Sequence, residues 1–414
     1  MRKLWVSLTL FFCILCLTSQ QIHADEEPSL QSQVNELKER LKELKSIVEK
    51  QQQEIAQLKQ SQETPPVQSV AQSQTQAGPT RAKFIPEIGV VADVALKLDS
   101  PRSDTGGADR VSVREVELVL GSNVDPFSRL DSTIAFSEES TAELEEAYLT
   151  RFGLPLNTTA RIGRVKPKIG KALPVHRDSL DTADEPLVIQ RYFGTEGMNK
   201  SGVDVTTLLD IPSPMVHQVT LGLLEGGTGD GGTIFGSTKR RPTLYTHLKN
   251  YLDITDLTNL EIGTSYAVGS KDLDAGFEVN VIGLDATWLH HLNSIQNVKL
   301  QGEAFHTDRR ESVDAATRED LNGHLWGGYG LFDFRISSQY ATGFRWDYVE
   351  LVDNPVTNPH KADLGYSGYL TFYQSEFARW RAQVSHFDLA SGKNDNQVLI
   401  QGTFAMGEHK HKLQ

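Results

Sequence analysis

Cysteine, long apolar runs and net positive charge are all scarce in this chain of 414 residues. Its only two cysteines, Cys13 and Cys16, lie near the N-terminus, so disulfide and thiol chemistry are excluded from the remainder. No later stretch reaches the roughly 18 consecutive apolar residues of a membrane helix. The net charge of -13 argues against nucleic-acid binding, and the mean hydropathy of -0.36 argues against a helical membrane protein.

Residues 1–24 have the features of a secretory signal peptide. Arg2 and Lys3 provide a positive start, and an apolar run follows over residues 4–17. This run is too short to span a membrane as a helix, and Ala24 supplies the small residue of a cleavage site. We therefore expect residues 1–24 to be removed when the chain is exported.

Residues 25–62 contain apolar side chains in a heptad pattern, separated mostly by Lys, Glu and Gln. The spacing alternates between four and three through Leu30, Val34, Leu37, Leu41, Leu44, Val48, Gln51, Ile55 and Leu58. This pattern predicts a coiled coil that serves oligomerisation, and its seam residues favour a two-helix coil. The alternative is a single helix lying on another surface. Residues 63–82 are rich in Pro, Gln and Ser, which indicates a flexible linker.

From residue 83 onward, segments of about ten residues alternate apolar and polar side chains and then turn. One segment has Ile88, Val90, Ala92, Val94, Leu96 and Leu98 on one face, and another has Ala378, Trp380, Ala382 and Val384. Polar residues lie between them, including Asp93, Arg379 and Arg381. A soluble sandwich would turn the apolar face inward, whereas a transmembrane barrel turns it toward lipid and leaves the polar face toward water.

Alternating segments occur at sixteen places: 87–99, 110–121, 128–138, 143–152, 159–168, 201–210, 215–225, 242–252, 258–269, 277–289, 297–307, 322–332, 337–346, 361–373, 376–387 and 396–406. The segment 322–332 lacks a clean alternation. Connections after even-numbered segments are short, and most of those after odd-numbered segments are long and polar, as in outer-membrane barrels. We predict an all-β fold, an antiparallel transmembrane β-barrel of about 16 strands over residues 83–414, preceded by an α-helical coiled coil in the periplasm.

Sequence motifs of catalysis are missing from the chain. It has no nucleophile elbow, no Gly-rich phosphate loop before a helix, no HExxH and no cysteine pair beyond the signal. We therefore predict no catalytic residues, no cofactor and no enzymatic activity. His409 and His411 lie in a terminal tail, and His290 and His291 lie at a predicted turn, so no metal site is predicted either.

Basic residues concentrate in the segment 159–205, which holds the longest connection of the predicted barrel. If the loop 169–200 folds into the lumen, it narrows the channel, and its basic groups can hold anions. The residues predicted to set the constriction and its selectivity are Arg161, Arg164, Lys166, Lys168, Arg177, Arg191, Arg129, Arg379 and Arg381. The alternative is a mixed pore in which lumen carboxylates such as Glu117, Glu146 and Glu303 balance them.

Three stretches carry a resemblance to the phosphate-selective porin O and P family: Glu145–Leu149, Arg161–Gly170 and Leu187–Gly202. The coil before the barrel is similar too. The resemblance implies a sixteen-stranded, trimeric, passive outer-membrane channel with a basic constriction. The same block and the terminal 407–411 are also similar to proteins labelled zinc-regulated TonB-dependent outer membrane receptors, but active uptake needs a plug domain and a larger barrel.

The leading prediction is an outer-membrane porin through which small hydrophilic solutes or ions diffuse passively. The resemblance implies that the protein is a homo-oligomer, namely a trimer. Besides these solutes, we expect the barrel to contact outer-membrane lipid. Two alternatives remain open. One is a structural or adhesive barrel with a closed lumen, whose coil holds periplasmic partners. The other is a metal-responsive outer-membrane receptor.

Overall fold

The computed structural model describes residues 42, 86–100, 110–138, 142–195, 197–226, 241–270, 278–312, 320–351 and 360–407. The chain divides into two units, Met1–Arg81 and Ala82–Gln414, and the second contains nearly all of these residues. Apart from the helical Lys42, the predicted signal peptide, coiled coil and linker lie outside the described residues, as do His409 and His411. These features stay predictions.

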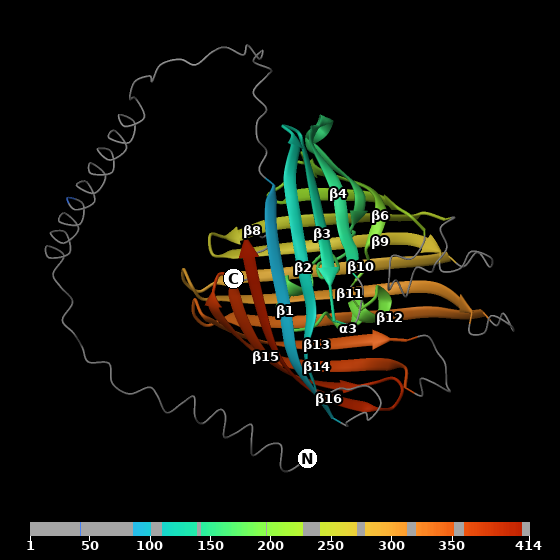
Figure 1. The fold of residues 1–414 in the computed structure, drawn as a ribbon. Coiled ribbons are helices and arrows are strands. Elements are labelled where there is room, and N and C mark those ends of the chain that lie inside the picture. The colour runs from blue at the N-terminus through green and yellow to red at the C-terminus, as the bar shows by residue number, and fades with distance from the viewer. Residues whose placement is uncertain are drawn as a thin grey trace, which may run out of the picture. The chain divides into compact units, whose positions relative to one another are not determined.

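The described residues of the second unit form a closed antiparallel barrel of sixteen strands, in which β1 pairs with β16 (Figure 1). The strands are β1 (Glu87–Ser100), β2 (Arg110–Asp125), β3 (Ser128–Phe136), β4 (Glu143–Leu154), β5 (Thr158–Val165), β6 (Lys200–Leu209), β7 (Val216–Leu224), β8 (Thr243–Thr255), β9 (Thr258–Ser270), β10 (Glu278–His291), β11 (Asn297–Ser312), β12 (Asp320–Arg335), β13 (Tyr340–Glu350), β14 (Ala362–Ser375), β15 (Ala378–Asp388) and β16 (Asn394–Gly407). Every predicted strand overlaps one of them, so the all-β barrel is confirmed.

The apolar face of the strands points out of the barrel. Ile88 in β1 and Val384 in β15 are exposed, whereas Asp93 and Arg381 on the opposite faces are buried. Each strand pairs with a neighbour on both sides, so the paired stretches can present an apolar outer surface to lipid with their backbone groups satisfied. The orientation predicted from the alternation is the one observed.

Short turns gather at one end of the barrel. The connections after β2, β8 and β14 span only 126–127, 256–257 and 376–377, whereas the connection between β5 and β6 spans 166–199. The predicted strand 159–168 was too long, because β5 ends at Val165. Pro167 has no backbone N–H to continue the pairing, so Lys166 and Lys168 belong to the loop.

Two β-bulges change which side chains point inward. The register between β1 and β2 shifts after Asp93, which leaves Arg114 as the extra residue, and the register between β3 and β4 shifts at Glu145. A bulge turns two consecutive side chains to one face of the sheet. As a result, both Glu145 and Glu146 are buried on the inner side.

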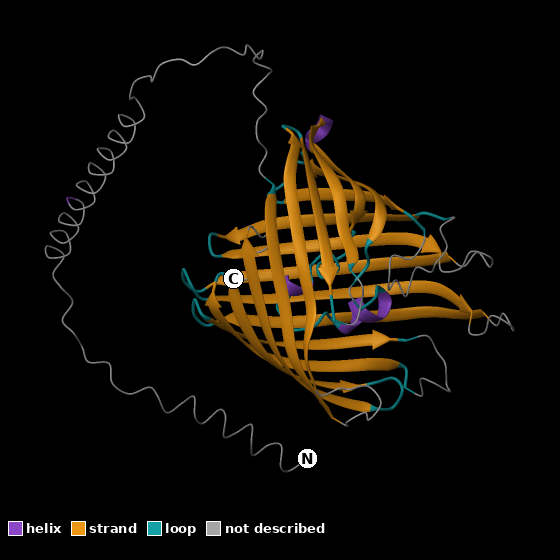
Figure 2. Ribbon diagram, viewed as in Figure 1, coloured by secondary structure: helices purple, strands orange, loops and turns teal. Residues whose placement is uncertain are grey.

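The helical segments are short: η1 (Pro155–Asn157), η2 (Arg177–Ser179) and α3 (Leu187–Tyr192). Within the described ranges, no helix has the length and apolar character needed to cross a membrane. The segments η2 and α3 belong to the connection 166–199, and α3 contacts β12 and β13 (Figure 2).

Candidate pore constriction

The connection 166–199, called the internal loop below, runs across the inside of the barrel. Its backbone reaches walls that are far apart in the ring of strands. The N–H of Gly170 donates to Ser265 in β9, the N–H of Ala183 donates to Gln383 in β15, and the N–H of Leu187 donates to Asp347 in β13. The loop is therefore held to several walls rather than to one side of the lumen.

Apolar side chains anchor the second half of the internal loop. Phe193 is fully buried and packs edge-on against Phe305 of β11, with ring centroids 5.3 Å apart. Tyr192 is also fully buried, and its hydroxyl donates to the Glu350 carbonyl oxygen at 3.0 Å. The wall residues of this cluster include Leu224, Tyr245, Val281, Leu325, Tyr329, Leu331 and Tyr369. The inner face was expected to be polar, so this apolar part is a correction to the prediction.

Charges are segregated along the internal loop. Its first part carries only basic groups: Lys166, Lys168, Lys171, His176 and Arg177. The part that follows carries only acidic groups: Asp178, Asp181, Asp184 and Glu185. The walls facing the two parts have the opposite signs, so the loop is held by electrostatic complementarity as well as by apolar packing.

The basic part faces carboxylates. The Lys171 ammonium lies 2.6 Å from Glu261, and the Arg177 guanidinium lies 3.5 Å from Glu115. The buried Glu303 carboxylate accepts the backbone N–H groups of Lys171 at 2.8 Å and Ala172 at 2.6 Å. These contacts fix the loop where it enters the lumen.

The acidic part faces arginine and lysine side chains. Arg345 is 1% exposed, and its guanidinium lies 2.7 Å from Asp347 and 3.2 Å from Asp184. Lys299 lies 2.6 Å from Asp181. Lys299 lies in β11, and Arg345 and Asp347 lie in β13. The acidic part of the loop is therefore held to these two strands.

Backbone carbonyl groups of the acidic part also accept hydrogen bonds from the wall. Arg381 donates to the carbonyl oxygens of Leu180 at 2.9 Å and Thr182 at 2.6 Å, and Arg379 donates to that of Asp178 at 2.5 Å. Both arginines thus lie on the inner face, as their parity predicts.

Arg161 and Lys168, two of the predicted selectivity residues, form one group. The guanidinium of Arg161 lies 2.5 Å from Asp204, and the Lys168 ammonium donates to Thr206 at 3.1 Å. Burial lowers the pKa of Lys168, and the positive charge of Arg161 adds to this effect. The group is therefore largely balanced rather than a free positive patch.

Arg164, Arg191 and Arg129 lie in other places. Arg164 lies 3.6 Å from Glu143, and Arg191 lies 2.7 Å from Asp363. Arg129 pairs with Glu87 and with Asp131, close to the turn that joins β2 and β3. The structure thus spreads the predicted residues over several sites.

A cavity of about 480 Å³ lies between the internal loop and β1, β2, β15 and β16. Four basic residues line it, namely Lys97, Arg110, Arg114 and Arg191, together with the acidic Asp184 and Asp395. Arg191 and Lys97 each have side chains that are 42% exposed. This cavity is where basic groups of the inner wall meet solvent.

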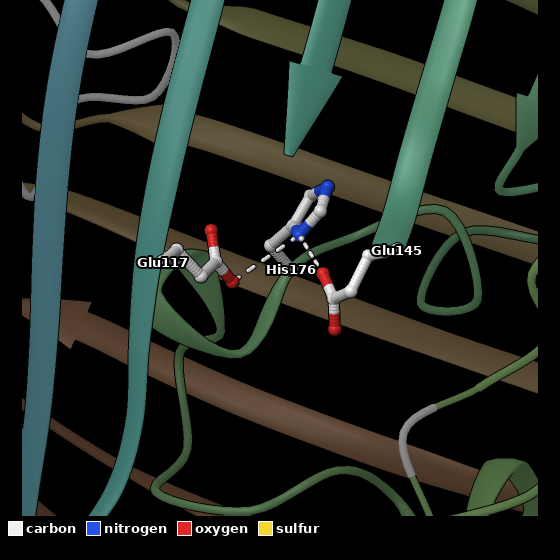
Figure 3. A group of neighbouring side chains, drawn as sticks. All are labelled: Glu117, Glu145 and His176. Carbon is white, nitrogen blue, oxygen red and sulfur yellow. Dashed lines mark ion pairs between the residues drawn. The ribbon is translucent and has the colours of Figure 1, made fainter. Parts of the chain in front are cut away.

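His176 joins the internal loop to β2 and β4. Its Nδ1 atom lies 3.3 Å from Glu117 and 3.1 Å from Glu145, and its Nε2 atom lies 3.0 Å from Glu146 (Figure 3 draws the first two). Burial alone would lower the pKa of His176, and Lys166 acts the same way. The carboxylate of Glu117 and its neighbours outweigh both and hold the pKa well above its usual range.

The sequence prediction did not single out Arg345, Arg114, Glu145 or His176 as site residues, although it placed Glu117 and Glu146 among the lumen carboxylates. The sequence pattern could have placed Arg345 on the inner face, since it lies between the outward-facing Phe344 and Trp346. It could not have placed Arg114 or Glu145, because a bulge reverses the parity of the alternation at each of them.

No family model matches the chain. An uncharacterized protein of Aquifex aeolicus (strain VF5) is 27% identical over 377 residues, covering 79% of each chain. Among solved structures, OprB of Pseudomonas putida shares 10% identity with a TM-score of 0.55, covering 78% of this chain and 94% of that one. An anion-selective porin from Comamonas acidovorans shares 7% (TM-score 0.53; coverage 78% and 100%), and the outer membrane channel DcaP of Acinetobacter baumannii shares 11% (0.52; 81% and 100%). At these identities the likeness establishes a porin-like barrel fold.

Proposed function

We propose that this chain is a bacterial outer-membrane porin, through which small hydrophilic solutes or ions diffuse passively past the internal loop. The observation that carries the proposal is a closed barrel, apolar outside and charged inside, with one loop held across its interior. Nothing in this arrangement needs an energy source, since wall charge and shape alone set which solutes pass. The similarity to porin folds supports the same class of function.

Assembly and location belong to the same proposal. The exposed apolar outer face suits contact with outer-membrane lipid, and a homotrimer follows the resemblance to porins. The predicted coiled coil would add a second oligomerisation element on the periplasmic side.

The packing inside the barrel favours one competing function, a closed structural barrel. The loop brings a buried apolar cluster and many paired charges into the lumen, and both reduce the space left for water. Planar-bilayer recording of the purified full chain separates the two functions. We expect stable, voltage-independent current steps in KCl, and a silent protein that is correctly folded would overturn the porin in favour of the structural barrel.

Selectivity is proposed to depend most on the basic groups that meet solvent. Arg191 and Arg161 each pair with a carboxylate, but the Arg191 side chain is 42% exposed and lines the 480 Å³ cavity, whereas that of Arg161 is 14% exposed. A unit charge about 10 Å from an ion in water contributes about 0.4 kcal/mol, which is roughly a twofold effect on ion occupancy. We therefore propose a weak anion preference that salt screens.

Arg191→Gln is expected to lower the anion-to-cation permeability ratio by about twofold at low salt, and by less at 1 M KCl. The ratio is measured from reversal potentials in a KCl gradient. Arg151→Gln makes the same charge change on the outer side near the β2–β3 turn, beside Asp125, and serves as the control. Equal ratios in both variants would remove Arg191 from selectivity.

A further inference from the structure

The cluster around His176 has the composition and spacing of a metal site. The Nδ1 atom of His176, Glu117 Oε1 and Glu145 Oε2 lie within 4.8 Å of one another. The Nδ1 atom lies 3.3 Å from Glu117 and 3.1 Å from Glu145. Ligands bound about 2.0–2.1 Å from a tetrahedral zinc ion lie about 3.3 Å apart, so the two separations from Nδ1 already match neighbouring ligand positions.

A second observation comes from Glu145 itself. Its side chain is 2% exposed, and its Oε2 atom makes no hydrogen bond within the described residues. This atom lies 3.1 Å from the His176 Nδ1 atom, with which it forms an ion pair when the ring is protonated. A buried carboxylate oxygen aimed in this way is suited to a third partner placed between the two residues.

A third observation concerns the other nitrogen of the imidazole. His176 Nε2 lies 3.0 Å from Glu146 Oε2. Histidines that bind metal commonly donate their second ring N–H to a carboxylate, which fixes the tautomer and orients the coordinating nitrogen. The bulge in β4 is what allows this arrangement, because it turns Glu145 toward one ring nitrogen and Glu146 toward the other.

Charge also favours a cation in this place. Glu115, Glu117, Glu145 and Glu146 are all buried here, as is Glu185 of the loop. Among the described residues, the cations that pair with them include Lys166, His176 and Arg177, with Lys166 Nζ 4.0 Å from Glu145 and Arg177 3.5 Å from Glu115. Uncompensated buried negative charge is costly, and a divalent ion would offset it while Lys166 and Arg177 pair with the other carboxylates.

We propose that Glu117, Glu145 and His176 bind one divalent transition-metal ion of the zinc class, with Glu146 orienting the histidine. One imidazole nitrogen and two carboxylate oxygens suit such an ion better than an all-oxygen site would. On binding, the metal takes the place of the proton on Nδ1, and that proton is released to solvent. The three ligands are at most 5% exposed, so the ion would be a structural ion and not a solute passing through the channel. It would bind the internal loop to β2 and β4. The inference does not depend on the channel conducting.

The test is calorimetric titration of Zn²⁺ into the full chain, purified in detergent and stripped with a chelator. His409→Ala and His411→Ala are introduced in every sample, so that the tail does not contribute. We expect one Zn²⁺ per chain, with binding lost in His176→Gln and weakened about 10–100-fold in Glu146→Gln. His247→Gln is the matched control, because this buried histidine pairs with Asp285 at 3.3 Å and belongs to no three-residue ligand group among the described residues.

X-ray absorption of the zinc-loaded chain gives an independent readout, with one imidazole and two carboxylates expected around the metal. Folding of each variant is checked by its heat-dependent electrophoretic mobility. If His176→Gln does not fold, Glu117→Gln and Glu146→Gln carry the comparison. Two results would overturn the proposal: no zinc binding by the chain with an intact cluster, or equal binding by that chain and by the cluster variants. Either would show that the cluster holds the loop by ion pairs only.

Discussion

Arg345→Met is expected to lower the free energy of unfolding by about 3–5 kcal/mol, the usual cost of leaving one partner of a buried ion pair alone. Arg345 and Asp347 are 1% and 0% exposed, and their side chains lie 2.7 Å apart. Arg345 also donates to Thr182 at 2.6 Å and to the Asp184 carbonyl oxygen at 2.7 Å. Its loss would therefore strand a buried carboxylate and release the acidic part of the internal loop.

Urea unfolding in detergent, followed by tryptophan fluorescence, measures the effect. Arg151→Met is the control, because its ion pair with Asp125 is about half exposed and should contribute almost nothing. The double variant Arg345→Met/Asp347→Asn removes both charges and keeps an oxygen for the Leu187 N–H, so it should recover part of the loss. A single variant as stable as Arg151→Met would show that Arg345 does not hold the loop.

The segment 322–332 shows where sequence reasoning reached its limit for the fold. Trp326 and Phe332 in β12 point outward, whereas Leu325, Tyr329 and Leu331 point inward and pack against the internal loop. Both faces are apolar, so the alternation is lost in the sequence. In β15, by contrast, exposed Trp380 and Val384 alternate with buried polar residues, and the period of two was enough to place the strand.

The site was less predictable, because its contacts join residues distant in sequence. Arg381 bonds the Leu180 carbonyl oxygen, which lies 201 positions away along the chain. Parity could place Arg381 on the inner face, but no local pattern specifies the partner. The same holds for Lys299 and Asp181. The sequence therefore showed the basic segment and left its balance by lumen carboxylates such as Glu303 as an open alternative. It did not show which carboxylate each loop residue contacts.

Excision of the internal loop is expected to raise single-channel conductance several-fold. Val165 and Lys200 are paired across β5 and β6, so a short Asn-Gly turn can join the two strands in place of residues 166–199. The sixteen-stranded wall keeps all its strand pairings, and only the obstruction inside it is removed. If the shortened chain does not assemble, Tyr192→Ala/Phe193→Ala keeps the loop but deletes its apolar anchor, and should give larger, noisier currents.

Planar-bilayer conductance of the full chain and the excised chain, recorded side by side in the same KCl solution, tests the account most directly. A passive channel narrowed by residues 166–199 predicts stable steps for the full chain and clearly larger steps after excision. Equal conductance in the two chains would contradict the role of the loop. Silence in both, with folding intact, would contradict the channel itself.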